Sequence, residues 1–334
     1  MRVPPSLVVA LCAAALVAGC GDDVNQSTTT SSGAGGSGGA SSSGTGGSSS
    51  GAGGSGGTVA GDCFADHHWP VAPDYDQYDP IIADHCAGTN HQTIEGIEKL
   101  VFLGDSVTEG TPPTPVAQFY RTLLADQLSQ TYPGLEVTEC AAWGARVRDL
   151  LGGDEQIPSC FPGPEPKRTL VVMTMGGNDI MAWAEDLLPY EQAMEEADDI
   201  AADLQAAIEW FYDDPNKFPA GVFVVFANPY EFTDGTGELG SCPGAAVIGL
   251  GGNYMEGAAA VSYLQEQFLR IAVETGTDMV FSLEAFCGHG FMRDTINACY
   301  VGPNAEAWFD LTCIHPNPAG HAAMADLFQT VIDE

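Results

Sequence analysis

Basic residues are scarce in this chain of 334 residues. Lysine and arginine together number 10, against 45 aspartates and glutamates, which gives a formal net charge of −35 at pH 7. A protein that binds the phosphate backbone of nucleic acid needs clustered lysine and arginine, so the composition argues strongly against nucleic acid as a partner. The same charge disfavours docking on anionic lipid head groups and indicates an acidic, solvated surface.

Motifs for metal or redox chemistry are also missing. The chain has no CxxC pair, and His67, His68, His85 and His91 lack the tight spacing of a metal site. Residues 74–79 carry closely spaced aspartates but lack the glycine and the final glutamate of an EF-hand loop. We therefore expect no metal site and no cofactor.

Long apolar runs are limited to the N-terminus. Residues 7–17 are apolar but too few to span a bilayer comfortably, and they follow Arg2 and end in Val17-Ala18-Gly19-Cys20. Small residues directly before a cysteine resemble the lipobox of bacterial lipoproteins, in which cleavage leaves the cysteine as a lipidated N-terminus. This resemblance implies a signal peptide at residues 1–20 and a lipid on Cys20. An ordinary secretory signal is the alternative.

Glycine, serine, alanine and threonine make up almost all of residues 21–61. Such a segment buries too little apolar surface to offset the entropy of ordering, so we expect a flexible linker with a reach of roughly 35 Å. Residues 62–334 suit a single large domain, in which 62–98 form an N-terminal extension. We expect an exported monomer, held near the membrane of a bacterial cell envelope only by its lipid anchor.

The cysteines of the body predict disulfide bonds. Ten cysteines are present, and Cys12 and Cys20 fall in the predicted signal peptide, which leaves eight. An even number in an exported chain indicates disulfides, although sequence alone does not determine their pairing. Pairing the cysteines in chain order closes a short local loop at each bond, so we predict that set. Its bonds are Cys63–Cys86, Cys140–Cys160, Cys242–Cys287 and Cys299–Cys313.

Apolar runs and helical spacing alternate along the body. A helix is indicated where apolar residues recur three and four positions apart, and a buried strand where a short apolar run ends at a turn. Strands that alternate with helices imply crossover connections, so the sequence predicts a three-layer α/β/α domain with a mostly parallel, five-stranded sheet. We expect strands at residues 99–103, 135–141, 169–175, 221–227 and 278–283, and helices at 116–128, 188–212, 256–275 and 318–332.

Polar motifs follow several of these strands. Ser106 comes after the first strand, Gly144 after the second and Asn178 after the third, and His315 lies in a late loop before the last helix. Ligand sites of open α/β sheets form outside the carboxyl ends of the strands, so these residues are placed to meet. Taken alone, Ser106 is better interpreted as a helix cap, and Asn178 as a residue that stabilises a loop.

In their order and spacing, the motifs resemble the sequence blocks of the SGNH, or GDSL, hydrolase family. GDS at residues 104–106 matches the nucleophile block, Gly144 the glycine block, GGND at 176–179 the GxND block, and HPNPAGH at 315–321 the final block. The resemblance spans residues 100–327 and implies a flavodoxin-like fold. The body contains no GxSxG elbow, so the larger α/β-hydrolase family fits worse.

The resemblance also implies a role for each residue. Ser106 is the expected nucleophile, and His315 is the expected base, which takes the serine proton and later protonates the leaving alcohol. The backbone N–H groups of Ser106 and Gly144 and the side-chain amide of Asn178 are the expected donors of the oxyanion hole. A glycine at position 144 leaves room for the approaching carbonyl.

One position departs from the family pattern. The family usually has an aspartate three residues before the base, where this chain has Thr312. Asp310 lies five residues before His315 and is the expected third member of the site if the loop bends to suit it. A backbone carbonyl that orients the imidazole is the alternative.

The sequence therefore predicts a lipid-anchored serine esterase that works through an acyl-enzyme. Its substrate is expected to be a carboxylic ester, either an acylated glycan, a lipid ester or a small soluble ester. The loop at residues 230–252 and the N-terminal extension are expected to shape the pocket. The absence of aspartate at position 312 supports one alternative, a surface lipoprotein of the same fold that binds glycans or partners without catalysis.

Overall fold

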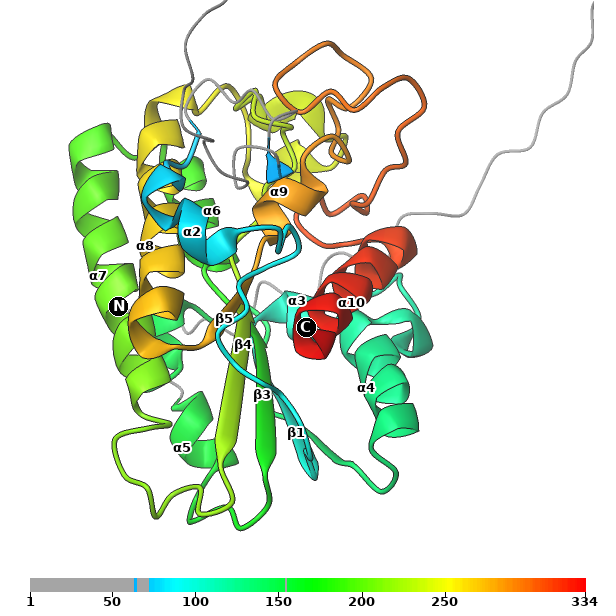
Figure 1. Ribbon diagram of the computed structural model, residues 1–334. Helices are drawn as coiled ribbons and strands as arrows, with labels where there is room; N and C mark the ends of the chain where they lie inside the picture. The colour runs from blue at the N-terminus through cyan, green and yellow to red at the C-terminus, as the bar shows by residue number, and fades with distance from the viewer. Residues whose placement is uncertain (1–62, 65–71, 154) are drawn as a thin grey trace, which may run out of the picture. The chain divides into compact units, whose positions relative to one another are not determined.

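The computed structural model describes residues 63–64, 72–153 and 155–334 (Figure 1). The predicted signal peptide at 1–20 with Cys20, the linker at 21–61, residue 62, and also His67 and His68 lie outside the described residues. Within the described ranges, no helix is both long enough and apolar enough to cross a membrane.

A five-stranded, wholly parallel sheet forms the centre of the domain, in the order β2-β1-β3-β4-β5. The strands are β1 (Lys99–Gly104), β2 (Glu136–Glu139), β3 (Thr169–Thr174), β4 (Val222–Ala227) and β5 (Asp278–Val280). Every residue of β3 is buried, as expected for a parallel strand that is covered on both faces. The predicted α/β class and the five strands are confirmed.

Helices cover both faces of the sheet. α7 (Tyr190–Glu209) packs against α8 (Ala258–Thr275) on one side, and α4 (Tyr120–Thr131) packs against α10 (Pro318–Asp333) on the other (Figure 1). These two layers complete the three-layer arrangement. The shorter α-helices are α2 (Asp79–Ile82), α3 (Ser106–Glu109), α5 (Gln156–Cys160), α6 (Gly177–Asp186) and α9 (Ser282–Phe286). The 3-10 helices are η2 (Asp76–Tyr78), η3 (Val116–Gln118), η4 (Val147–Asp149), η5 (Leu239–Ser241), η6 (Ala245–Ile248) and η7 (Met255–Gly257).

Two helical regions differ from the prediction. The helix expected over 116–128 begins only at Tyr120, because Phe119 is extended and η3 forms a separate turn before it. The segment before α7 holds a helix that the sequence pattern does not predict, since α6 starts at Gly177, inside the GGND motif. As a result, Asn178 lies in the first turn of a helix.

The last strand is shorter than predicted. The sequence pattern predicts a strand over 278–283, but β5 stops at Val280 and Ser282 opens α9. The Asn228 side chain accepts the Leu283 N–H at 3.0 Å, and the Ser282 hydroxyl donates to the Asn228 carbonyl. Because Asn228 lies 55 residues from Leu283 in the chain, a local pattern does not reveal this contact.

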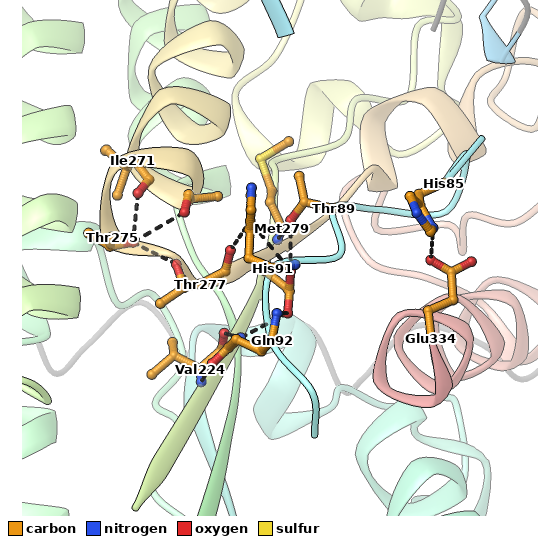
Figure 2. Close-up of polar contacts among 12 residues, drawn as sticks. His85, Thr89, His91, Gln92, Val224, Ile271, Thr275, Thr277, Met279 and Glu334 are labelled. Carbon is orange, nitrogen blue, oxygen red and sulfur yellow. Dashed lines mark hydrogen bonds and ion pairs between the residues drawn. The ribbon is translucent and has the colours of Figure 1, made fainter. Parts of the chain in front are cut away.

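The N-terminal extension covers the edge of the sheet at β5. The Thr89 N–H donates to the Met279 carbonyl at 2.9 Å, and the Met279 N–H donates to the Thr89 hydroxyl at 2.9 Å (Figure 2). The Asp278 carboxylate accepts the backbone N–H groups of His91 and Gln92 at 2.6 and 3.2 Å. An uncovered edge strand invites pairing with another chain, and here the extension occupies that position.

The described histidines of the extension have partners within the protein. His85 Nδ1 lies 2.6 Å from the Glu334 carboxylate, and His91 Nδ1 lies 2.7 Å from the Thr277 carbonyl oxygen (Figure 2). In the part of the chain that the structure describes, no three His, Cys, Asp or Glu side chains are grouped in a way that could hold a metal ion.

Four disulfides join the eight cysteines of the body. Cys63–Cys86 and Cys140–Cys160 are confirmed. The predicted Cys242–Cys287 and Cys299–Cys313 bonds are wrong, since the structure pairs Cys242 with Cys313 and Cys287 with Cys299. The Cys242–Cys313 bond spans 71 residues and encloses the Cys287–Cys299 bond, so pairing the cysteines in chain order does not find it. Four disulfides indicate an extracytoplasmic protein.

Candidate active site

Ser106 lies directly beyond β1, in a tight turn that glycine makes possible. Gly104 has a φ of 136°, and a Cβ atom there would lie 2.3 Å from the Thr174 carbonyl oxygen. The N-cap of α3 is Asp105, whose side chain accepts the Val107 N–H at 2.9 Å. Because Asp105 supplies the cap, the Ser106 hydroxyl is available for a different contact.

His315 makes that contact. Its Nε2 lies 2.8 Å from the Ser106 Oγ, although the two residues are 209 apart in the chain. The loop before the histidine is held closed by a bridge between Phe309 and Pro316 and by the Asp310 N–H, which donates to the His315 carbonyl at 2.9 Å. Burial lowers the pKa of His315 to about 4, so the imidazole is neutral at pH 7 and able to accept a proton.

Thr312 connects the His315 ring to a buried carboxylate. Its Oγ1 lies 2.7 Å from His315 Nδ1, and its hydroxyl donates to Asp310 Oδ1. The single proton of the Thr312 hydroxyl is used in its hydrogen bond to the carboxylate, so the hydroxyl oxygen can only accept a hydrogen bond from the imidazole. His315 Nδ1 therefore carries a proton. Nε2 is then the acceptor that faces Ser106, which is the tautomer that a base requires.

Asp310 reaches the imidazole through Thr312. Its carboxylate accepts hydrogen bonds from the hydroxyl and the N–H of Thr312, the latter at 2.8 Å, and among the described residues neither carboxylate oxygen is hydrogen-bonded to the His315 ring. Burial raises the pKa of Asp310, and the two hydrogen bonds from Thr312 oppose that rise. The predicted third residue, Asp310, is therefore close to the predicted base, His315, with the Thr312 hydroxyl between them.

Asn178 lies in the first turn of α6 and faces the loop that contains Gly144. Its Nδ2 donates to the Ala145 carbonyl at 2.9 Å, which leaves the second N–H of the amide for another acceptor. The Asp179 carboxylate accepts the Val147 N–H at 3.2 Å, and burial raises the pKa of Asp179 to about 6. These two bonds hold the GGND motif against the loop after β2.

Gly144 adopts a backbone conformation that favours glycine. Its φ is 76°, in the left-handed region, whereas a Cβ atom at this position would meet no atom within 4 Å. The constraint that the structure shows is therefore conformational, and crowding of a bound carbonyl remains a prediction. The Gly144 N–H donates to no acceptor within the described residues.

A cavity of about 190 Å³ opens at Ser106 and His315. Its wall is mainly apolar, and both segments predicted to shape the pocket contribute to it. Phe232 and Leu250 come from the loop at 230–252, and Pro73 comes from the N-terminal extension. The Cys242–Cys313 disulfide joins that loop to the loop that carries His315.

Residues 102–323 match the model of the GDSL-like lipase/acylhydrolase family. The chain belongs to this family. The matched range contains Ser106, Gly144, Asn178 and His315, and the predicted SGNH/GDSL relationship is confirmed. As a GDSL-like lipase/acylhydrolase, the protein is an ester hydrolase at the level of its family.

Several solved structures resemble this GDSL-like lipase/acylhydrolase at low identity. An acetylxylan esterase from Geobacillus stearothermophilus is 21% identical, over 73% of this chain and 97% of the other, with a TM-score of 0.46. An extracellular lipase from Streptomyces rimosus is 20% identical, over 70% and 99%, with a TM-score of 0.44. A phospholipase A1 from Streptomyces albidoflavus is 19% identical, over 70% and 99%, with a TM-score of 0.44. No curated protein matches the chain.

Two parts of the site are absent from the sequence prediction. At position 312 the chain lacks the aspartate of the family pattern, whereas in the structure the Thr312 Oγ1 lies 2.7 Å from His315 Nδ1. The available signal is a hydroxyl residue two positions after an aspartate, a spacing that favours local hydrogen bonds. The second part is the wall formed by α6, for which the apolar spacing of Ile180 and Ala184 is the signal.

Proposed function

We propose that this GDSL-like lipase/acylhydrolase is a serine esterase, with Ser106 as the nucleophile and His315 as the general base. The observation that carries the proposal is the 2.8 Å contact between Ser106 Oγ and His315 Nε2. A serine hydroxyl is a weak nucleophile until a neighbouring base takes its proton. The neutral imidazole, with its acceptor nitrogen directed at Ser106, supports this assignment.

In the proposed acylation, Ser106 Oγ attacks the ester carbonyl carbon while His315 Nε2 takes the hydroxyl proton. The carbonyl oxygen becomes an oxyanion, which accepts hydrogen bonds from the Ser106 N–H, the Gly144 N–H and the Asn178 amide. Loss of one such donor typically costs about 3 to 4 kcal/mol in the transition state. The bond to the alcohol oxygen then breaks, and His315 gives its proton to the departing alcohol.

In the proposed deacylation, water takes the place of the alcohol. His315 removes a proton from the water, whose oxygen attacks the acyl-enzyme carbonyl and forms a second oxyanion in the same hole. The bond to Ser106 Oγ then breaks, the serine recovers its proton from His315, and the carboxylic acid leaves. No metal ion or cofactor takes part in these steps.

Thr312 and Asp310 have positioning roles in this proposal. Each half-reaction turns His315 into a positively charged imidazolium, whose Nδ1–H points at the Thr312 hydroxyl. The Asp310 carboxylate accepts a hydrogen bond from that hydroxyl, and through the hydroxyl it stabilises the positive charge of the imidazolium. Asp310, predicted from the sequence as the third member of the site, thus acts through Thr312.

We also propose that the enzyme is exported and anchored by a lipid on Cys20. Four disulfides support an oxidising compartment, and the small residues before Cys20 support lipidation. We expect Cys20→Ala to move the activity from the membrane fraction to the soluble fraction of expressing cells. Equal membrane association of Cys20→Ala and wild type would contradict the lipid anchor.

Hydrolysis of p-nitrophenyl acetate tests the proposed function. We expect Ser106→Ala and His315→Ala to lower kcat by at least about 10³-fold, because each removes a member of one catalytic unit. Ser129→Ala, which changes an exposed serine on α4, is the matched control and is expected to equal wild type. Thermal unfolding checks that each variant is folded. A Ser106→Ala enzyme with the wild-type rate would leave the non-catalytic binding protein as the explanation.

A further inference from the structure

The cavity at Ser106 continues along one face of α6. Asn178 stands in the first turn of this helix, and Ile180, Met181 and Ala184 follow it along the cavity wall. Trp183 belongs to the opposite face, where it is buried and its Nε1 donates to Glu196 at 2.7 Å. The helix therefore leads from the proposed oxyanion hole along an apolar surface.

The facing wall is apolar as well. Leu239 and Leu250 from the loop at 230–252, and Met255 and Val261 from η7 and α8, line the other side of the cavity. Tyr254 also lines it, and its hydroxyl donates to the Leu188 carbonyl just beyond α6 at 2.9 Å. This bond ties the segment after α6 to the segment before α8.

Polar side chains in this wall are already bonded within the protein. The Glu231 carboxylate accepts the N–H groups of Thr233 and Gly235, the latter at 2.7 Å. The Asn228 amide donates to the buried Glu284 carboxylate at 3.0 Å and accepts the Leu283 N–H at 3.0 Å. Such groups offer few hydrogen bonds to the hydroxyl groups of a sugar, so the wall suits an aliphatic ligand.

We infer that this cavity binds the acyl part of the substrate, and that the preferred esters carry an unbranched aliphatic acyl chain of medium length. The inference rests on the proposed function, which places the reacting carbonyl at Ser106 and Asn178. From Asn178 to Ala184 the helix rises by about 9 Å. A saturated chain of roughly six to eight carbons covers that distance.

The acyl-chain profile of the enzyme tests the inference. We expect kcat/KM for p-nitrophenyl esters to rise roughly three- to fourfold for each methylene from acetate to octanoate, because each methylene leaves water for an apolar wall. Beyond about eight carbons the gain is expected to stop, because a chain of that length already covers the distance from Asn178 to Ala184. A profile that is flat, or that is highest for acetate, would overturn the inference and leave the esterase proposal intact.

A pair of alanines on α6 provides a matched comparison. Ala184 lines the cavity, whereas Ala182 on the same helix does not. We expect Ala184→Phe to lower the octanoate-to-acetate ratio of kcat/KM at least tenfold, and Ala182→Phe to keep the wild-type ratio. Val261→Phe, on the facing wall, is expected to lower the ratio in the same way. An unchanged ratio in both Ala184→Phe and Val261→Phe would overturn the inference.

A binding measurement separates the cavity from the chemistry. Calorimetric titration of folded Ser106→Ala protein with octanamide and acetamide is expected to show tighter binding of octanamide, and Ala184→Phe in that background is expected to remove the difference. Preferential binding of octanamide without hydrolysis of any ester would sustain the acyl cavity and reject the proposed function. Equal binding of the two amides would reject the cavity.

Discussion

Thr312 lies between the His315 imidazole and the Asp310 carboxylate, and both of its hydroxyl contacts are expected to affect the rate. Thr312→Val removes the hydroxyl, leaves the Nδ1–H of His315 unpaired and disconnects Asp310. A hydrogen bond to a charged group contributes about 1.5 to 3 kcal/mol, so we expect kcat to fall roughly tenfold to 150-fold with little change in KM.

The conservative variant distinguishes the hydroxyl from the bulk of the side chain. Thr312→Ser keeps the hydroxyl and is expected to retain most of the wild-type kcat. Asp310→Asn is expected to lower kcat less than Thr312→Val does. The amide oxygen of asparagine still accepts a hydrogen bond from the Thr312 hydroxyl, but it carries no charge. Steady-state kinetics on p-nitrophenyl acetate measure all three. A serine variant as slow as the valine variant would argue against a positioning hydroxyl.

The pH dependence follows from the burial of His315. Burial lowers its pKa to about 4, and only the neutral ring accepts the Ser106 proton. For an uncharged ester, kcat/KM should therefore be maintained as the pH falls through the ordinary histidine value of about 6.5, and should be lost near pH 4. A pH–rate profile measures this limb, with circular dichroism to confirm folding. A midpoint above about pH 6 would contradict the assignment.

The lowered pKa of His315 also makes the free energy of unfolding depend on pH. Its pKa is lower in the folded than in the unfolded chain, so the unfolded chain binds the proton first as the pH falls below about 6.5. This residue therefore contributes stability that is present above that pH and lost on the way to pH 4. Burial raises the pKa of Asp105 and of Asp179 to about 6, and these carboxyl groups act in the opposite direction. The activity profile is the cleaner measurement, because the stability effects oppose each other.

At the scale of elements, the Cys242–Cys313 disulfide joins the loop at residues 230–252 to the loop that carries His315. Replacing both cysteines by serine opens a bond that spans 71 residues, for which loop-closure entropy predicts a loss of about 4 kcal/mol. We expect kcat to fall as well, because the loop that positions His315 loses its attachment.

The Cys63–Cys86 disulfide serves as the control for this prediction. It spans 23 residues and ties down the N-terminal extension, so its double serine variant should lose about 3 kcal/mol with kcat unchanged. Denaturant unfolding and steady-state kinetics on both double variants check the comparison. Equal effects on kcat would show that the Cys242–Cys313 bond has no special role at the site.

The predictable elements are those whose signals are local. Short apolar runs that end at glycine or polar residues mark the strands, and β4 at Val222–Ala227 lies within one residue of its predicted range. Helix α6 escapes prediction because its N-cap is Gly176, which provides no side-chain cap, so the usual start signal is missing. The end of β5 escapes prediction because Asn228 determines it from a distance.

The candidate site likewise contains residues that local sequence signals predict and one residue whose role they do not predict. Ser106, Asn178 and His315 are predictable because their motifs follow strands or precede the last helix, and parallel strands bring such positions to one edge. The role of Thr312 is not predictable from the sequence. It depends on a reversal of the chain at Cys313, whose φ is 76°, and Cys313 is in turn bonded to Cys242.

At the scale of the whole molecule, the excess of acidic residues sets the response to salt. A formal charge of −35 means that carboxylates repel one another in the compact state. Salt screens this repulsion over a Debye length of about 8 Å at 0.15 M. We expect the melting temperature to rise by a few degrees between about 10 mM and 300 mM NaCl. Calorimetry at fixed pH measures the shift, and a melting temperature that falls with salt would contradict it.

The segment that covers β5 has a consequence for how the molecule matures. Thr89 hydrogen-bonds to Asp278, which lies 189 residues later in the chain, and His85 contacts Glu334, which lies 249 residues later. Since synthesis proceeds from the N-terminus, the extension is made long before these partners, and the edge of the sheet at β5 is covered only after residues 278–280 have been made. Chains cut short before the final helix lack both α10 and the Glu334 partner of His85, so they are expected to be less stable than the full chain.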